Sequence, residues 1–413
     1  MYYQIVLLSS IIFLLVFIHI YVTLYLLKIN GDDDDDIIAS TNEYLCPQYP
    51  TSKGYIHVDF TDNFSLNYSK ICKSDDILLI YIISKAEHIE RRKRIRRTWA
   101  NKNRYGQLLQ TCFIFLVGYQ TNYSQSIRSE AQIYNDIIRL NIDETYQNII
   151  YKEIGALKWS QIYASHIPYL FKTDDDIIVD TLLLSDIVKY FLDSNIDHSD
   201  YIQRHEDVQN FINEITMDNR YNLFRGIYLN GYKTIRRGKF ALNNIAWNSD
   251  YLPAYCSGVG YIFSSFIRDR LYRASLCYAM ENIPWMSDLF ISGFLATAAA
   301  VHCSPWSIGY IQSRNGCSSS FQNQPRLLLC STSMHIGRLY MDDYDEAWTA
   351  ILDRHLLTNE TIDEERKKYV RLLKIQAQEK LPIEQSIIEQ IENDSIAQNE
   401  SIVPLSKMAV KLD

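Results

Sequence analysis

Three consecutive aspartates, Asp174, Asp175 and Asp176, are the residues of this chain that most clearly could do charge-dependent chemistry. They lie between two apolar runs, residues 168–171 and 177–179, which are rich in Ile, Val and aromatic residues and predict a buried strand. Ionised carboxylates at the end of such a strand repel one another and lose hydration, so they need a compensating cation. In an extended chain Asp174 and Asp176 point to the same side, and this pair can hold a hard divalent cation that keeps positions open for phosphates. The alternative is an exposed acidic turn.

A strongly basic segment, residues 90–99, contains six Lys and Arg residues. Ile95 and Trp99 are four positions apart, so one face of a helix can be buried while the arginines face an anion. Nuclear-localisation and heparin-binding patches have similar compositions.

Two isolated residues further along could complete a site. Asp288 lies among apolar residues such as Trp285 and Phe290, and a carboxylate in such surroundings suits a general base. The alternative for Asp288 is a helix N-cap. His335 is the second of them, and a lone histidine is usually structural.

The composition of the 413-residue chain indicates a folded body of considerable size, because 47% of the residues are apolar. A net charge of −8 argues against general nucleic-acid binding. The 23-residue apolar run Ile5–Leu27 is long enough to span a bilayer, and we interpret it as an uncleaved signal anchor, which excludes the nuclear interpretation of the basic segment. Six Asn-x-Ser/Thr sequons favour a lumenal body, in which most of the eight cysteines would pair.

The order of expected elements predicts an α/β fold. Apolar runs at 77–84 and 112–118 are typical of central parallel strands, and helical patterns at 125–136 and 146–163 alternate with them. This alternation predicts a mostly parallel sheet with helices on both faces. The three aspartates would then lie at the carboxyl end of their strand, where open α/β sheets bind ligands.

Taken together, these segments resemble the β-1,3-glycosyltransferase family, which includes β-1,3-galactosyltransferases and β-1,3-N-acetylglucosaminyltransferases. The resemblance covers roughly residues 75–345 in five ordered blocks. The residues that carry it are Arg91, Arg92, Ile95, Arg96, Thr98 and Trp99; Glu130, Tyr134, Asp136, Asp143, Tyr146, Asn148, Lys152 and Trp159; Lys172 and Asp174 to Asp176; Tyr255, Ser257, Gly258, Gly260, Tyr261 and Ser264; and Asp288, Phe290, Gly293 and Ala296. One departure is Ser287, which stands where the family usually has an acid.

The resemblance implies a GT-A type fold in a Golgi type II membrane protein that uses a UDP-sugar donor and Mn²⁺. It also implies a metal site of Asp174, Asp176 and His335, donor binding by Lys172, Asp174, Asp175 and the arginines at 91, 92 and 96, and Asp288 as the base. The expected domains are a cytoplasmic tail (1–4), the anchor (5–27), a stem (28–74), the catalytic domain (75–380) and a polar tail (381–413).

The expected activity is transfer of galactose or N-acetylglucosamine from UDP to a glycan acceptor on a glycoprotein or glycolipid, in β-1,3 linkage with inversion. The Ser287 departure leaves a second hypothesis, a catalytically impaired membrane-anchored protein that binds glycans or UDP-sugars. A third, a metal-dependent lumenal hydrolase, ranks last because the sequence shows no second cluster of His or carboxylates for a dinuclear site.

Overall fold

The computed structural model describes residues 56–60, 68–101, 110–193, 200–203, 205–217, 220–238, 241–242, 247–279, 284, 286–306, 309–313, 316–332 and 343–356. All of them belong to one compact unit, Thr51–Asp413. The expected anchor at residues 5–27 and the polar tail lie outside the described residues. Among the helices that are described, none has the length and apolar character needed to cross a membrane.

Within the described residues, ten strands form two sheets. They are β1 (Leu78–Ile83), β2 (Thr111–Tyr119), β3 (Ile137–Asp143), β4 (Tyr169–Asp174), β5 (Ile177–Val179), β6 (Phe224–Leu229), β7 (Tyr255–Ser264), β8 (Ser304–Pro305), β9 (Gly309–Ser313) and β10 (Leu327–Thr332). The larger sheet has the order β3-β2-β1-β4-β7-β6-β8, and the smaller has the order β5-β10-β9. In the larger sheet β7 is antiparallel to both of its neighbours and the other pairs are parallel, which confirms the expected mostly parallel α/β sheet and fits a GT-A type fold.

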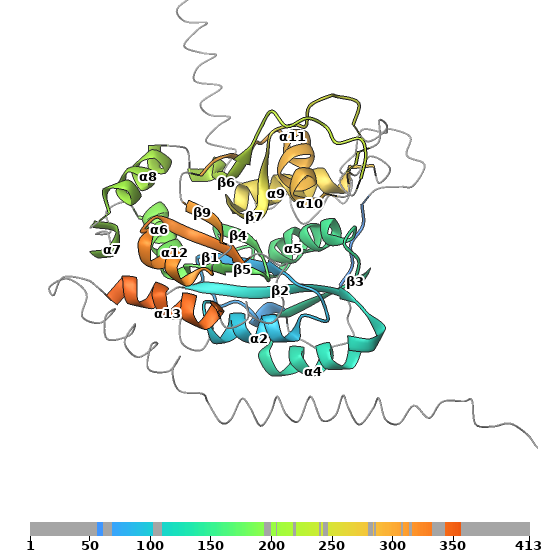
Figure 1. Ribbon diagram of the computed structural model, residues 1–413. Helices are drawn as coiled ribbons and strands as arrows, with labels where there is room; N and C mark the ends of the chain where they lie inside the picture. Colours follow the sequence, from blue (N-terminus) through green and yellow to red (C-terminus); the bar gives the residue numbers. More distant parts are fainter. Residues whose placement is uncertain are drawn as a thin grey trace, which may run out of the picture. The chain divides into compact units, whose positions relative to one another are not determined.

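Helices cover both faces of the larger sheet (Figure 1). The α-helices are α2 (Ile89–Arg97), α4 (Ser124–Tyr134), α5 (Ile149–Tyr163), α6 (Thr181–Leu192), α7 (Asp200–Gln203), α8 (Glu206–Met217), α9 (Ser265–Leu276), α10 (Ser287–Leu289), α11 (Ala296–Ala298), α12 (Ser318–Asn323) and α13 (Asp343–Leu356). Shorter helical segments are η3 (Tyr68–Lys70), η4 (Thr121–Tyr123), η5 (Arg220–Asn222) and the π-helical η7 (Phe290–Leu295).

Strand β1 separates two hydrophobic cores, which explains its unbroken apolar sequence. Its residues Leu78, Ile80 and Ile82 belong to the core that contains Ile95 and Trp99, as expected for the buried face of the basic segment. The alternate residues of β1 belong to the core built on α5 and α9. In Figure 1, α2 and α4 lie on one side of the sheet and α5 and α9 on the other.

Part of the expected stem packs against this body. Ile56 and Val58 are buried in the α5 core, and Phe60 forms a β-bridge with Leu140. The expectation that most cysteines pair is confirmed for the described part of the chain. The three disulfides between described residues are Cys72–Cys112, Cys256–Cys303 and Cys317–Cys330.

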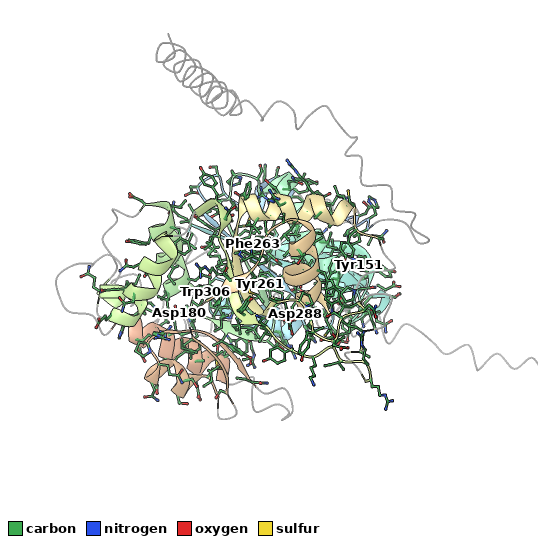
Figure 2. All side chains as sticks on the ribbon, turned by 90° about the horizontal axis from the view of Figure 1, so that it is seen from above. Tyr151, Asp180, Tyr261, Phe263, Asp288 and Trp306 are labelled. Carbon is green, nitrogen blue, oxygen red and sulfur yellow. A yellow bond between two sulfur atoms is a disulfide. The ribbon has the colours of Figure 1, made fainter. Side chains whose placement is uncertain are left out.

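Helix α13 is anchored by a buried carboxylate at the start of α6, Asp180 (Figure 2). Asp180 caps α6 by accepting a hydrogen bond from the Leu183 amide at 3.0 Å. Its other oxygen accepts from Arg354 Nε at 3.0 Å and pairs with His355 Nε2 at 2.8 Å. Burial raises the pKa of Asp180, but these two cations outweigh burial and hold that pKa well below its usual range. Helix α13 is therefore fixed to the start of α6, a few residues after the aspartate run.

Candidate active site

A cavity of about 760 Å³ opens at the carboxyl ends of β1 and β4. These ends meet because β1 and β4 are parallel neighbours, with Ile83 paired to Asp174. The charged residues of the lining are Lys85, His88, Arg91, Glu144, Lys152, Lys172, Asp174, Asp175, Asp176, Lys233 and Asp288. The main apolar and aromatic residues are Tyr146, Ile149, Tyr232, Ile235, Leu252, Tyr255 and Met286. One cavity therefore brings the three predicted aspartates and the predicted base together.

The chain is extended only as far as Asp174, which ends β4. Asp175 and Asp176 lie in the turn that leads to β5. The alternating side-chain directions of a strand, which we expected for Asp174 and Asp176, therefore do not extend past Asp174. They apply instead to Lys172 and Asp174. All three carboxylates nevertheless line the cavity because the turn closes over the end of the sheet.

Asp175 is the most firmly held of the three carboxylates. Its Oδ2 lies 2.7 Å from His88 Nδ1, and its Oδ1 accepts a hydrogen bond from Arg91 Nη1 at 2.9 Å. Burial raises the pKa of Asp175, but the hydrogen bond with His88 and the charge of Arg91 outweigh burial, so this pKa lies below its usual value. Asp175 is therefore ionised and ties the start of α2 to the aspartate turn.

Asp174 is paired with a buried lysine of the same strand. Lys172 is 1% exposed and donates from Nζ to Asp174 Oδ1 at 2.7 Å and to the carbonyl oxygen of Gly258. Burial lowers the pKa of Lys172, but Asp174 and Glu153 reverse this and raise it. The lysine is therefore charged and neutralises part of the acidic run.

Asp176 differs from its neighbours because it forms no hydrogen bond or ion pair with any other residue that the structure describes. Burial and the charges of Asp174 and Asp175 raise its pKa to about 6. The negative charge around Asp176 is thus only partly neutralised by the neighbouring cationic side chains. A divalent cation beside Asp176 and Asp174 would supply the missing charge, and carboxylate oxygens are the donor type that such cations accept.

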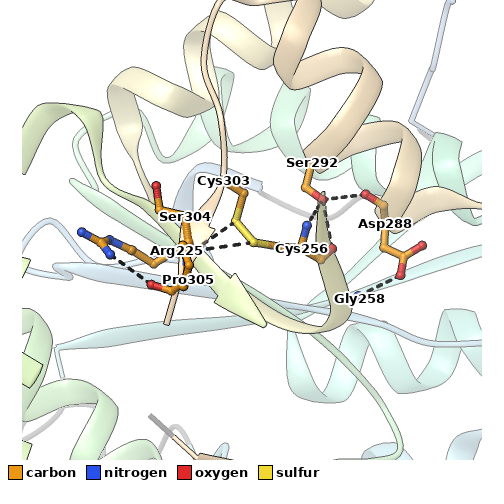
Figure 3. Close-up of a disulfide and its surroundings, with 8 residues drawn as sticks. All are labelled: Arg225, Cys256, Gly258, Asp288, Ser292, Cys303, Ser304 and Pro305. Carbon is orange, nitrogen blue, oxygen red and sulfur yellow. Dashed lines mark hydrogen bonds between the residues drawn. A yellow bond between two sulfur atoms is a disulfide. The ribbon is translucent and has the colours of Figure 1, made fainter. Parts of the chain in front are cut away.

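Asp288 of α10 lines the same cavity as this run, and Figure 3 shows its side chain beside Gly258. Its Oδ2 accepts a hydrogen bond from the Gly258 amide at 3.1 Å, and its Oδ1 accepts one from the Leu289 amide at 2.9 Å. The space at Gly258 is tight, because a Cβ there would lie 3.1 Å from Lys172 Nζ and 3.3 Å from Asp288 Cβ, and one of these side chains would have to move. The N-cap of α10 is Met286, so Asp288 is not the helix cap.

The disulfide Cys256–Cys303 lies behind this corner of the cavity (Figure 3). The hydroxyl of Ser292 joins the two parts: it accepts from the Cys256 amide at 2.8 Å and lies 2.7 Å from the Asp288 carbonyl oxygen, to which it can donate. The residue before the predicted base, Ser287, donates from Oγ to Glu153 Oε1 at 2.5 Å. A carboxyl group therefore remains next to Asp288 even though residue 287 is a serine.

The structure places two of the three predicted anion-binding arginines away from the cavity. Arg92 is fully buried and forms two hydrogen bonds with Glu130, each 2.8 Å long. Arg96 bridges Glu130 and Asp136 and stacks on the rings of Phe115 and Tyr134. We call Arg92, Arg96, Glu130 and Asp136 the arginine cluster. The expectation that Arg92 and Arg96 face the anion is corrected, because neither lines the cavity and their donors are used elsewhere. Arg96 donates within this cluster, and Arg92 donates both within it and to Ser84 and the carbonyl oxygens of Lys85 and Ala86.

Two other predicted features lie outside the described residues: His335, the third expected metal ligand, and Trp285, a neighbour of the base. Sequence reasoning also missed His88, Glu153 and Tyr232. A signal existed for Glu153, because it interrupts the buried stripe formed by Ile150, Ile154 and Leu157 on α5. His88 carries no comparable pattern.

This geometry defines a class of protein: an α/β protein with an acid-lined cavity at the carboxyl edge of a mostly parallel sheet. The Galactosyltransferase family model matches residues 90–306, more than half of the chain. The chain therefore belongs to the galactosyltransferase family, and the resemblance noted in the sequence is confirmed.

Three relatives show the range of this similarity. Beta-1,3-galactosyltransferase 2 of Homo sapiens is 28% identical over 221 residues, 52% of this chain and 46% of the relative. UDP-GalNAc:beta-1,3-N-acetylgalactosaminyltransferase 1 of Mus musculus is 28% identical over 210 residues, 50% and 56% of the two chains. Beta-1,3-galactosyltransferase 1 of Mus musculus is 27% identical over 218 residues, 52% and 59%. The matched part spans about half the length of these curated relatives.

Proposed function

We propose that this protein is a UDP-sugar-dependent β-1,3-glycosyltransferase that transfers a hexose to a glycan acceptor with inversion. The observation that carries the proposal is that Asp288 and the Asp174–Asp176 run line one and the same cavity. The names of the relatives point to galactose or N-acetylgalactosamine as the sugar, and the sequence resemblance adds N-acetylglucosamine.

The proposed reaction is one displacement at the anomeric carbon. An acceptor hydroxyl oxygen forms the new bond to that carbon while the bond to the diphosphate oxygen breaks, and UDP leaves with the bonding electron pair. The hydroxyl proton passes to the carboxylate of Asp288. Attack on the face opposite the leaving group inverts the anomeric configuration, so Asp288 and the group that holds the diphosphate must lie on opposite sides of the sugar.

Negative charge develops on UDP as it leaves, and the proposed donor-binding side of the cavity is cationic in part. Arg91 and Lys172 lie there, although each is paired with an aspartate. We propose that Asp174 and Asp176 hold Mn²⁺, with His335 as a third candidate ligand. When bound, the cation would supply positive charge for the leaving diphosphate. The raised pKa of Asp176 supports this assignment, because it reports a local deficit of positive charge.

We propose that the acceptor occupies the aromatic side of the cavity. Tyr146 and Tyr232 are 45% and 55% exposed, and Tyr255 lines the same cavity. Burial and then the charge of Asp288 raise the pKa of Tyr146, and the same two causes raise that of Tyr255 to about 12, which indicates that both rings lie near the proposed base. Such rings offer an apolar face for a pyranose and a hydroxyl for its polar edge.

We also propose that the body is lumenal, in a Golgi type II membrane protein. The disulfides support an oxidising compartment. The sequon at Asn122 lies on the exposed segment η4, where a glycan can be attached. Protease treatment of sealed microsomes should leave the body intact, and endoglycosidase should increase its mobility. Digestion of the body without detergent would contradict this location.

The decisive experiment for the activity is UDP release from an array of UDP-sugars and glycan acceptors. We expect release to depend on both substrates, and Asp288→Asn to reduce it by a factor of about 10² to 10⁴ while donor affinity stays within about twofold. The near-isosteric amide keeps one oxygen, which can accept from the Gly258 amide or from the Leu289 amide but not from both, and it cannot take a proton. Tight UDP-sugar binding without transfer in the unmodified protein would favour the glycan- or UDP-sugar-binding alternative.

A further inference from the structure

Glu153 is a fully buried acid of α5 that the proposed reaction does not use. Both of its oxygens are occupied: Ser287 Oγ donates to Oε1 at 2.5 Å, and the Tyr261 hydroxyl donates to Oε2. Glu153 therefore joins three elements, α5, β7 and α10. Burial raises the pKa of Glu153, and the charge of Lys172 opposes this. Such a buried acid persists only when its hydrogen bonds are satisfied.

The contact with Ser287 lies one residue from the proposed base. Ser287 begins α10, which has only three residues and continues directly into the π-helical η7. This start is short and irregular, so its own backbone bonds constrain it less than those of a long α-helix would. The carboxylate of Asp288 is held from the opposite side by the Gly258 amide at 3.1 Å. Asp288 is thus held at two points. Its side chain accepts a hydrogen bond from the Gly258 amide, and its backbone continues from Ser287, whose hydroxyl is bound to Glu153.

We propose that Glu153 is a positioning residue that, through the hydroxyl of Ser287, fixes the first turn of α10 and so sets where the carboxylate of Asp288 stands in the cavity. This inference rests on the proposed function of Asp288 as the base. It assigns to the Ser287 contact a role in turnover and none in donor binding, because Ser287 forms no hydrogen bond with the aspartate run in the described part of the chain. Glu153 differs in that its charge also stabilises the charged Lys172 beside Asp174, so the Ser287 variants carry the test of donor binding.

The geometry also explains why a serine can serve at this position. A hydroxyl at residue 287 reaches a carboxyl group that comes from α5, and the second oxygen of that carboxyl is fixed by Tyr261, itself fully buried. Tyr261 pairs across the sheet with Lys172 of β4. The paired strands β4 and β7 therefore position both Lys172, which pairs with Asp174, and Tyr261, which holds Glu153.

The test compares Ser287→Ala, Ser287→Thr, Glu153→Gln and the double variant Glu153→Gln/Ser287→Ala in the full chain. A shift of the base by 1 Å can cost about 100-fold in rate, so we expect Ser287→Ala to lower kcat about tenfold or more. KM for the UDP-sugar should stay within about twofold, and Ser287→Thr, which keeps the hydroxyl, should stay close to the unmodified rate. The double variant should be no slower than the slower single variant, because one contact links the two residues.

Ser160→Ala is the matched control. Ser160 is also fully buried on α5, and its hydroxyl donates to the Leu157 carbonyl at 3.0 Å, so it loses one buried hydroxyl bond without affecting α10. Its Tm should fall about as much as that of Ser287→Ala, with kcat unchanged. An unchanged kcat in both Ser287→Ala and a folded Glu153→Gln, while the unmodified protein turns over, would overturn the positioning role alone. Absence of transfer by the unmodified protein with every donor and acceptor would overturn the proposed function and the positioning role together.

Discussion

The arginine cluster and the aspartate run are made of similar charged residues, and adjacent residues of α2 contribute to both. Arg91 binds Asp175 at the cavity, whereas Arg92 binds Glu130 in the core. In the arginine cluster two arginines face two carboxylates, and both arginines lie below 10% exposure. In the aspartate run, Asp176 has no such partner among the described residues.

This difference separates two uses of buried charge. The arginine cluster satisfies its own hydrogen bonds, and the pKa of Glu130 lies below its usual value because Arg92 and Arg96 outweigh burial. The aspartate run leaves two carboxylates, Asp174 and Asp176, with raised pKa values in an open cavity, chiefly because both are buried. A self-satisfied cluster contributes to folding specificity, whereas an incompletely compensated one is suited to recruit a ligand from solution.

The largest expected effect is on stability, in the arginine cluster. Glu130→Gln removes one charge from a buried network and leaves Arg92 and Arg96 with too few acceptors. We expect the free energy of unfolding to fall by about 3–5 kcal/mol, with kcat of the folded protein unchanged. Denaturant unfolding followed by circular dichroism measures the first quantity. Glu90→Gln, at an exposed pair with Lys93, is the control and should cost at most about 1 kcal/mol. A Glu130→Gln protein that is as stable as the unmodified protein but impaired in transfer would show that the arginine cluster serves activity rather than stability.

The corresponding change in the aspartate run should have the opposite signature. Asp176→Asn removes a carboxylate that would compensate the cation, so transfer should fall by a factor of about 10² to 10³, the usual cost of losing one electrostatic stabiliser. Stability without added metal should not fall, because repulsion from Asp174 and Asp175 is relieved. Activity and Tm measured side by side test this. Asp345→Asn, at a half-exposed pair with Arg97, controls for loss of an ordinary surface carboxylate. A large loss of Tm in Asp176→Asn would show that the residue is structural.

The smallest effect concerns pH. The pKa of Asp176 is raised from 3.8 to about 6 in the folded protein. The native state therefore binds more protons than the unfolded state within this window, and stability contributed by this group falls as pH rises from about 4 to 6. We expect the slope of unfolding free energy against pH in this window to be less negative in Asp176→Asn than in the unmodified protein.

Excess Mn²⁺ above pH 6 should raise Tm in the unmodified protein and much less in Asp176→Asn. Thermal unfolding across the pH series, with and without the cation, gives both quantities. Identical pH slopes in the two proteins would show that Asp176 does not titrate with a raised pKa. An equal rise of Tm in both proteins would show that the cation binds elsewhere.

The sequence predicted the aspartate run at a strand end because apolar residues on both sides leave little choice of position. It could not assign the arginines. Consecutive residues of an α-helix are rotated by about 100°, so whether Arg91 or Arg92 faces the cavity depends on where α2 begins, and that is decided by packing of Ile95 and Trp99. Glu153 was missed for a related reason: its hydrogen-bond partners, Tyr261 and Ser287, are more than 100 residues away in the chain.

The central place of β1 has a consequence for dissecting the chain. The family match covers residues 90–306, yet β1 lies before it and pairs with both β2 and β4. Helix α13 lies after it, and the hydroxyl of Tyr344 on this helix donates to the Asp175 carbonyl oxygen at 3.2 Å. A fragment cut at the ends of the match would expose two unpaired strand edges in mid-sheet, which invite edge-to-edge association. Expression of such a fragment should yield aggregate, so the shortest useful piece must keep residues 56–356.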